Sequence, residues 1–250
     1  MTRRAKAIVQ YDGTDFVGFQ RQKNGRTVQA VLEQALSSLF GHTVTVKGAG
    51  RTDSGVHARG QVISFLYEGG MPGSRISRAV QGFLPDDVAI SESFEVPLEF
   101  DPQKDAVSKT YCYRIWRGER PDILIGRYAH RFAGPLDLDL MRRESASLLG
   151  KHDFASFRAS GSSAKTTVRE VKDASWSSKM MAGGELLEFW IAADGFLYKM
   201  VRLIVGTLLD IGRGHLKEGT VARLLGSPEP GGAGQCVPGK GLCLEKVSFS

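Results

Sequence analysis

The chain has few of the residues on which disulfide frameworks and metal centres depend. Its 250 residues include three cysteines, Cys112, Cys236 and Cys243, and no Cys-x-x-Cys pair. An odd number of cysteines argues against a disulfide framework and suits a reducing compartment such as the cytoplasm. The five histidines are scattered, with no His-x-x-x-His spacing. We therefore expect no metal site.

Long apolar runs and nucleotide-binding loops are also missing. No apolar stretch approaches the length needed to cross a bilayer, and residues 1–4 lead straight into a strand pattern without a signal-like segment. The glycine-containing loop at residues 48–53 lacks the third glycine of a Rossmann loop, and no Walker motif is present. We expect no membrane association and no cofactor.

Positively charged residues outnumber negatively charged ones. A composition of 42% hydrophobic and 24% charged residues is that of a globular protein with a sizeable core. The net charge of +6 and the isoelectric point near 9.3 favour a polyanionic partner. Residues 1–60 carry nine Lys/Arg against four Asp/Glu, and residues 107–170 carry twelve against seven. These two basic segments are candidates for a surface that faces phosphates.

The first part of the chain alternates strand and helix patterns. Apolar residues between Thr27 and Gly41 recur on one helical face, with Thr27 as the predicted N-cap and Gly41 as the predicted stop. We expect strands at 5–10, 43–47, 61–67 and 88–96, and a second helix at 74–83. The resulting order, β-α-β-β-α-β, is that of the split βαβ unit found in ferredoxin-like and RNA-recognition folds.

A similar pattern follows in the second part. We expect strands at 106–116, 168–177, 185–193 and 242–249, helices at 137–149, 197–211 and 218–225, and a Gly/Pro-rich loop at 227–241. The sequence thus predicts an α+β fold of two related ferredoxin-like halves, residues 1–105 and 106–250. We expect mainly antiparallel sheets, joined around a central cleft.

The loop at residues 48–60, GAGRTDSGVHARG, concentrates reactive residue types between two expected strands. Its glycines allow sharp turns and the close approach of a ligand. Asp53 has Arg51 and Arg59 near it in the sequence, which favours an ionised carboxylate that can act as a nucleophile. Thr-Asp-Ser-Gly is also typical of an ordinary turn. The residues alone leave both interpretations open.

Residues 50–58, GRTDSGVHA, resemble the signature of the tRNA pseudouridine synthase A family, and residues 11–22 resemble the opening pattern of the same family. The aspartate of that signature is the catalytic residue of all pseudouridine synthases. The resemblance therefore implies the pseudouridine synthase fold and a catalytic role for Asp53. A fourth match, residues 151–158, corresponds to a loop near the active cleft without a catalytic role.

Two motifs in the second half extend the resemblance. Residues 109–115, KTYCYRI, are similar to the motif whose first tyrosine contacts the target base, which implies that role for Tyr111. Without the resemblance, the position of this tyrosine on an expected strand indicates a side chain that packs within a half-buried sheet. Residues 196–206, FLYKMVRLIVG, are similar to the motif whose arginine pairs with the catalytic aspartate. This implies a pair between Arg202 and Asp53, and a buried arginine does need a partner.

The activity implied by the resemblance is the isomerisation of uridine to pseudouridine at positions 38, 39 and 40 of the tRNA anticodon arm. It needs no cofactor, and the family's members are homodimers with tRNA lying across both subunits. Arg51 is expected either to fill the space of the flipped base or to contact a phosphate. One departure from the pattern, Cys112 in place of a frequent basic residue, removes one RNA contact.

Three other functions remain open from the residues. An RNA-binding module of two such halves would need neither Asp53 nor Arg202. A hydrolase acting on a glycosidic or phosphate bond is a second alternative. A glycosidase usually needs a second carboxylate, and the motifs at residues 50–58, 109–115 and 196–206 hold none besides Asp53. A pseudouridine synthase of another specificity is disfavoured, because the motifs are those of the A family.

Overall fold

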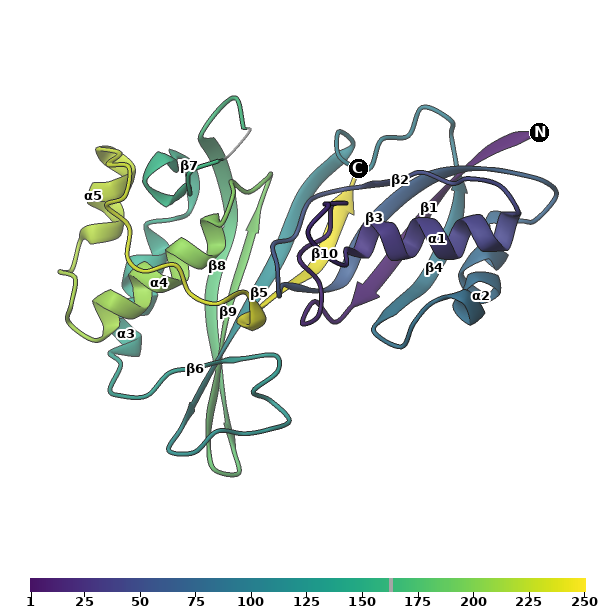
Figure 1. Ribbon diagram of the computed structural model, residues 1–250. Coiled ribbons are helices and arrows are strands. Elements are labelled where there is room, and N and C mark those ends of the chain that lie inside the picture. The colour runs from purple at the N-terminus through teal and green to yellow at the C-terminus, as the bar shows by residue number, and fades with distance from the viewer. Residues whose placement is uncertain (162–163) are drawn as a thin grey trace. The chain divides into compact units, whose positions relative to one another are not determined.

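The computed structural model describes residues 1–161 and 164–250. The chain forms two compact units. The first comprises Met1–Val107 together with Cys243–Ser250, and the second comprises Ser108–Leu242. Figure 1 follows the chain from the purple N-terminus to the yellow C-terminus. Each unit contains both strands and helices.

The sheet of the first unit is built around two long strands. β1 (Thr2–Tyr11) lies between β4 (Val88–Val96) and β3 (His57–Glu68), and it is antiparallel to both. The short β2 (Val46–Gly48) is antiparallel to β3. β10 (Leu242–Phe249) returns from the end of the chain and pairs with β3 in parallel.

Two helical segments complete the first unit. α1 (Val28–Phe40) begins after Thr27, whose side chain accepts a hydrogen bond from the amide of Ala30, and it ends at Gly41 in the left-handed conformation, with φ 70°. α2 (Ile76–Val80) is short and is flanked by the 3₁₀ turns Gly73–Arg75 and Gln81–Phe83. The core consists of fully buried side chains from the sheet and from α1, among them Ala5, Ala7, Ile63, Phe65, Leu32 and Leu36.

The sheet of the second unit is antiparallel apart from a two-residue strand. β5 (Ala106–Gly118) pairs with β9 (Gly184–Ala193), β9 with β8 (Val168–Met181), and β8 with β7 (Gly150–Asp153). β6 (His130–Arg131) pairs with β5 in parallel. A β-bulge in β8 shifts its register against β9 between Val171 and Asp173.

The helices of the second unit are α3 (Leu138–Ala146), capped by the side chain of Asp137, α4 (Met200–Gly212) and α5 (Thr220–Gly226). The 3₁₀ turns Ala155–Phe157 and Gly239–Gly241 lie in the loops. Strand and helix side chains form a buried core that includes Tyr113, Ile115, Phe189, Ile191, Ile204 and Leu208.

The predicted α+β class with mainly antiparallel sheets is confirmed. The strand predicted at 43–47 is wrong in its extent, because β2 covers only Val46–Gly48. The amide of Val44 bonds to the hydroxyl of Ser37 (2.9 Å) and that of Val46 bonds to the carboxylate of Glu33 (3.0 Å). These amides are satisfied by α1 side chains instead of a neighbouring strand.

The starts of β3 and α4 also differ from the prediction. β3 begins at His57 and not at residue 61, so the last two residues of the signature, His57 and Ala58, lie in a strand. α4 begins at Met200, because residues 197–199 form a turn in which the amide of Met200 bonds to the carbonyl of Leu197 (3.1 Å). Lys199 at the end of this turn has the left-handed φ of 58°.

The last strand lies in the first unit. The predicted division at residues 105 and 106 places 242–249 in the second half, whereas β10 pairs with His57 and Ala58 of β3. The assignment of distinct catalytic roles to the two halves stays a prediction. Among the described residues, no helix is both long and apolar enough to cross a membrane.

Candidate active site

The loop that carries Asp53 is joined to the segment at residues 11–22. Asp53 forms an isolated antiparallel bridge with Gly18, and the amide of Phe19 donates to the carbonyl of Thr52 (3.1 Å). Gly18 has φ 125°, and a Cβ at this position would lie 3.0 Å from the carbonyl oxygen of Thr52. Glycine is therefore required here by both conformation and space. The two sequence motifs of the first half form one structure.

The Thr-Asp-Ser-Gly turn predicted from the sequence is present. The amide of Val56 donates to the carbonyl of Asp53 (3.2 Å), and Gly55 has φ 73°. The amide of Gly55 and the hydroxyl of Ser54 both donate to the carbonyl of Phe16, at 3.3 and 3.2 Å. Because the main chain closes this turn, the turn and the catalytic interpretations of Asp53 are compatible.

Buried polar side chains support the loop from within the first unit. The hydroxyls of Tyr11 and Thr52 are 2.8 Å apart, and the side-chain amide of Gln61 donates to the carbonyl of Gly50 (2.9 Å). Tyr11, Thr52 and Gln61 are all buried. Burial raises the pKa of Tyr11 well above its usual value, so its phenol stays protonated. These contacts hold the main chain that leads into Asp53.

His57 also has a supporting role that sequence reasoning missed. Its ring is buried, and the amide of Gly13 donates to its Nδ1 (3.0 Å). The Asp12 carboxylate lies 3.2 Å from the same nitrogen, so Nδ1 of His57 lies close to two groups of the segment at residues 11–22. His57 belongs to the matched signature, but nothing in the sequence indicated its contact with Gly13.

The two arginines of the signature differ in their surroundings. Arg59, on β3, points its Nε toward the carboxylate of Glu245 on β10 at 3.9 Å, and its side chain is largely exposed. The positive charge of Arg59 is thus close to the carboxylate of Glu245. The sequence did not indicate this ion pair. Arg51 is exposed on the loop. Both predicted roles of Arg51 stay predictions.

Tyr111 lies in the second unit, on β5 opposite Ile191. It is buried, and its ring meets that of Phe196 edge to face, with centroids 5.1 Å apart at 86°. Phe196 belongs to the matched motif at residues 196–206 and Tyr111 to the one at residues 109–115. Two motifs of the second half therefore meet in this ring pair. The contact of Tyr111 with a substrate base stays a prediction.

Arg202, on α4, is half-buried and is anchored at one end. Its Nε donates to the carbonyl of Val237 (2.8 Å), and the amide of Val237 donates back to the carbonyl of Arg202 (3.4 Å). The hydroxyl of Tyr113 donates to the next carbonyl, that of Pro238 (2.9 Å). The Gly/Pro-rich loop thus fixes the orientation of Arg202. The pair between Arg202 and Asp53 stays a prediction.

The same loop is held against α4 over its preceding residues. The amide of Gly234 donates to the hydroxyl of Thr207 (2.9 Å), and that of Gln235 donates to the carboxylate of Asp210 (3.3 Å). A Cβ at Gly206 would lie 1.7 Å from the carbonyl oxygen of Gln235. The loop therefore reaches its position only because residue 206 has no side chain.

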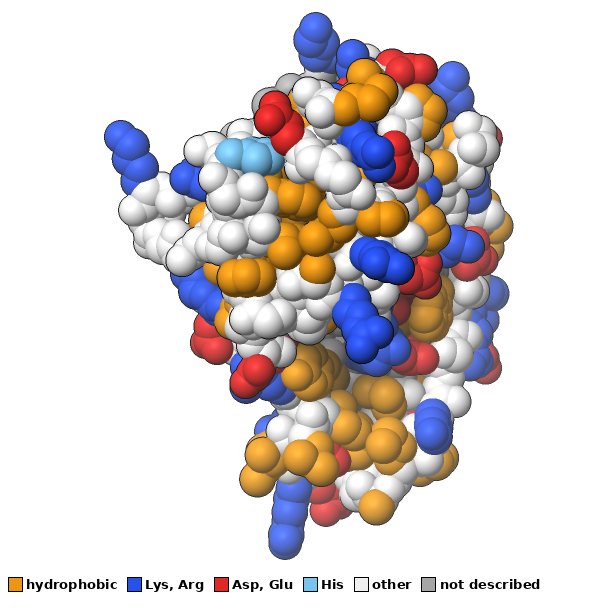
Figure 2. All heavy atoms as spheres, turned by 90° about the vertical axis from the view of Figure 1, so that its right-hand side faces the viewer, with side chains coloured by type: hydrophobic (Ala, Val, Ile, Leu, Met, Phe, Trp, Pro, Cys, Tyr) orange, Lys and Arg blue, Asp and Glu red, His pale blue; other side chains and the backbone are white. Residues whose placement is uncertain are grey.

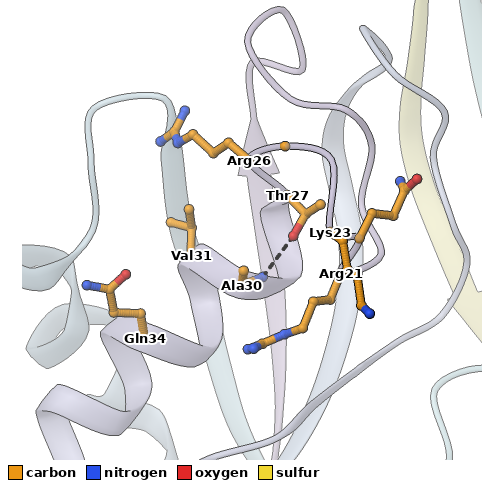
Figure 3. A pocket seen from close by; sticks show the side chains of 9 residues that line it. Arg21, Lys23, Arg26, Thr27, Ala30, Val31 and Gln34 are labelled. Atoms are coloured by element: carbon orange, nitrogen blue, oxygen red, sulfur yellow. Dashed lines mark hydrogen bonds between the residues drawn. The ribbon is translucent and has the colours of Figure 1, made fainter.

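A surface hollow lies beside the segment that supports the Asp53 loop. Figure 3 shows Arg21, Lys23 and Arg26 around it, with the bond from the amide of Ala30 to the hydroxyl of Thr27 at its floor. Arg21 is paired with Glu33 on α1. Arg26 is likewise paired with a carboxylate, that of Asp87 (2.9 Å). The positive charges of Arg21 and Arg26 are therefore largely balanced by acidic neighbours. We assign this hollow no catalytic role.

Basic side chains are spread over the surface. On the face shown in Figure 2, Lys and Arg side chains are interspersed with acidic and apolar ones. Within the described parts of the chain, no group of three or more His, Cys, Asp or Glu side chains is arranged to hold a metal ion.

Comparison with known proteins identifies the family. A family model described as tRNA pseudouridine synthase matches residues 7–103 and 145–250. tRNA pseudouridine synthase A of Acetivibrio thermocellus is 42% identical over 99% of this chain and 100% of its own length. The proteins of the same name from Geobacter sp. strain M21 and Citrifermentans bemidjiense are 44% and 43% identical, over 99% of this chain and 99% and 98% of theirs.

The matched ranges contain the Asp53 loop with its supporting segment, and also Arg202 with the loop that anchors it. Tyr111 lies between the two matched ranges but within the alignments to the three relatives, which span nearly the whole chain. The chain therefore belongs to the tRNA pseudouridine synthase family and is an isomerase that converts uridine to pseudouridine in tRNA.

Proposed function

We propose that Asp53 is the catalytic carboxylate and that the target uridines are those at positions 38, 39 and 40 of the tRNA anticodon arm. The observation that carries this proposal is the fixed main chain around Asp53. It is bonded to Gly18 and Phe19 on one side and closed by the turn to Val56 on the other. A nucleophile needs such a defined position, because small displacements reduce the rate strongly.

The reaction rearranges bonds without an external reactant. The bond between N1 of uracil and C1′ of ribose breaks, the uracil turns, and a bond forms between C5 and C1′. The proton that leaves C5 is balanced by the one that N1 gains. A single carboxylate serves this chemistry either by attacking C1′ or by accepting a proton so that a glycal forms. Both routes require Asp53 to be ionised at the start.

Arg202 and Tyr111 have supporting roles in this proposal. Arg202 would orient the Asp53 carboxylate with its terminal guanidinium nitrogens, since its Nε is used by Val237. Tyr111 would lie against the uracil and assist the removal of the C5 proton. Its ring is already set at a right angle to Phe196, which limits its rotation.

Recognition of the RNA would depend on backbone and shape. Three neighbouring target positions are incompatible with strict reading of one base sequence. The uridine must leave its stack, at a cost of a few kcal/mol. Arg51, exposed beside Asp53, would fill the vacated space or contact a phosphate. We further propose that the protein acts in the cytoplasm as a homodimer, with tRNA lying across both subunits.

The test is tritium release from tRNA that carries 5-tritiated uridine in the anticodon arm, with nothing else added. We expect the wild-type protein and Asp139→Asn, a control on the exposed side of α3, to release tritium, and Asp53→Asn to release none. Mapping of pseudouridine in the product should place it at positions 38, 39 and 40.

Other outcomes assign a different function. Release by Asp53→Asn at the wild-type rate would remove Asp53 from the chemistry. Free uracil in the product would indicate a glycoside hydrolase. Pseudouridine outside the anticodon arm would leave the catalytic assignment intact and overturn the proposed specificity.

A further inference from the structure

Two positively charged side chains lie on the same face of the second-unit sheet as Tyr111. Lys109 precedes Tyr111 by two residues on β5, and side chains two residues apart on a strand point to the same face. In the register of the sheet, Lys109 lies opposite Ala193, and Ala193 lies opposite Val171. Arg169 precedes Val171 by two residues on β8. Lys109 and Arg169 therefore share the face that presents Tyr111.

These two cations are close enough to affect each other. Burial, and then the positive charge of Arg169, lower the pKa of Lys109. Both side chains are half-buried. Among the described residues, no carboxylate forms an ion pair with either one. Two partly buried like charges without a counter-charge are unfavourable, so the arrangement favours a bound anion.

The neighbouring groups leave this charge uncompensated. Nη1 of Arg169 donates to the carbonyls of Thr166 (3.1 Å) and Val168 (2.6 Å), which are uncharged acceptors that fix the guanidinium. Glu170, the acid next to Arg169 in the sequence, lies on the opposite face of the sheet, because side chains alternate along a strand. Asp194, which follows Ala193 at the end of β9, accepts a bond from the amide of Glu170 (3.0 Å). Gly195 places no side chain over the Nε of Arg169, which would lie 3.5 Å from a Cβ there.

We propose that Lys109 and Arg169 together bind one backbone phosphate of the RNA, next to the nucleotide whose base contacts Tyr111. The inference rests on the proposed function, because it takes Tyr111 as the residue against the target base. Two residues along a strand span about 7 Å, so a base at Tyr111 and a phosphate at Lys109 belong to the same or to adjacent nucleotides. This phosphate contact fixes the register of the RNA without reading its sequence.

The experiment measures the dissociation constant of an anticodon-arm RNA hairpin as a function of salt, for the wild-type protein, Lys109→Met and Lys109→Arg. Lys179→Met, at an exposed position of β8, is the matched control. We expect Lys109→Met to weaken binding about tenfold and to reduce the slope of log K against log salt by about 0.7 to 0.9. Lys109→Arg and Lys179→Met should stay within about threefold of the wild type.

A chemical substitution in the RNA then identifies the phosphate. Hairpins with one neutral methylphosphonate at each linkage around the target uridine should include one that weakens wild-type binding and leaves Lys109→Met unaffected. If Lys109→Met keeps the wild-type affinity and salt slope, or if no linkage shows this difference, the proposal is wrong. Tritium release by the wild type on the same hairpin is measured separately, so failure of the proposed function is recognised independently.

Discussion

The α-carbon of Gly13 faces the carbonyl of Val56 so closely that a Cβ at residue 13 would lie 2.0 Å from its oxygen. The amide of the same glycine donates to His57, the residue after Val56. Gly13 is thus in contact with the end of the Asp53 turn from two directions. The structure of the turn depends on a residue 40 positions away in the sequence.

Replacement of Gly13 by alanine should displace the Asp53 turn. A methyl group against a main-chain oxygen cannot be accommodated by a rotamer change, so we expect the free energy of unfolding to fall by about 1–3 kcal/mol. Turnover should fall by more than the loss of folded protein would explain, because Asp53 is displaced from its position. Gly82→Ala is the control, since a Cβ there meets nothing within 4 Å. Urea unfolding and tritium release measure the two effects, and equal behaviour of the two variants would contradict the prediction.

In the second unit, Gly206 also lies against a main-chain carbonyl group. A Cβ there would overlap the carbonyl oxygen of Gln235, so Gly206→Ala should push the Gly/Pro-rich loop away from α4 and weaken the bond between Arg202 and Val237. We expect a loss of stability of about 1–3 kcal/mol and a large loss of turnover. Gly226→Ala, near the end of α5 in open space, should change neither. Amide hydrogen exchange at Val237 reports the local change directly.

Tyr111 and Tyr113 should respond differently to the loss of their hydroxyl groups. Tyr113 donates to Pro238 from a buried position, so Tyr113→Phe should lower the free energy of unfolding by about 1 kcal/mol. Tyr111→Phe keeps the ring contact with Phe196 and should fold, while its turnover falls. Thermal unfolding and turnover of both variants provide the comparison. A Tyr111→Phe protein with wild-type turnover would leave Tyr111 as a packing residue.

The ion pair between Arg26 and Asp87 should contribute to stability only when Asp87 is ionised. The hydrogen bond from the Arg26 guanidinium holds the pKa of Asp87 below its usual value of 3.8. Its contribution is therefore present above about pH 4 and is lost as the pH falls through the lowered pKa. For this partly exposed pair we expect about 0.2–1 kcal/mol. Urea unfolding of wild type, Arg26→Gln, Asp87→Asn and the double variant at neutral and acidic pH measures it.

RNA binding through Lys109 should weaken at a lower pH than the usual pKa of a lysine would give. Because burial and Arg169 lower the pKa of Lys109 below its usual 10.5, its charge is lost as the pH rises through the lowered value. Wild-type affinity should fall in this range, and Lys109→Arg should keep its affinity because a guanidinium stays charged. Over the same range the unfolded chain binds more protons than the folded one, so stability should rise with pH. Parallel loss of affinity in both proteins would contradict the assignment.

The parts of the fold that depend on local sequence were predictable. α1 has the predicted cap at Thr27 and stop at Gly41, and β4 and β10 have the predicted bounds. Gly60 shows why other boundaries were not. Glycine near a strand usually marks a loop, yet Gly60 lies within β3. This strand position is occupied by glycine because a Cβ there would lie 2.4 Å from the carbonyl oxygen of Glu245. The reason is a strand that arrives from 185 residues further along the chain.

The candidate site was predictable to a similar degree. Asp53, Tyr111, Arg51 and Arg202 were all recognisable as motif residues, and the bridge between Asp53 and Gly18 gives two of the motifs a common structure. The buried groups that hold the loop, such as His57, were not predictable, because hydrogen bonds to a main-chain amide leave no periodic pattern in the sequence. The candidate residues could be named from the family motifs, and their roles stay predictions, whereas the groups that support them became visible only in the structure.

The position of β10 has a consequence for how the protein is made. β10 pairs with β3 at His57 and Ala58, which directly follow the Asp53 turn, but the ribosome must first add the whole of the second unit. At about 5–20 residues per second, this takes on the order of ten seconds. During that time the edge of β3 lacks its partner and is open to wrong pairing. The loop that carries Asp53 is thus synthesised early and reaches its final surroundings among the last parts of the nascent chain.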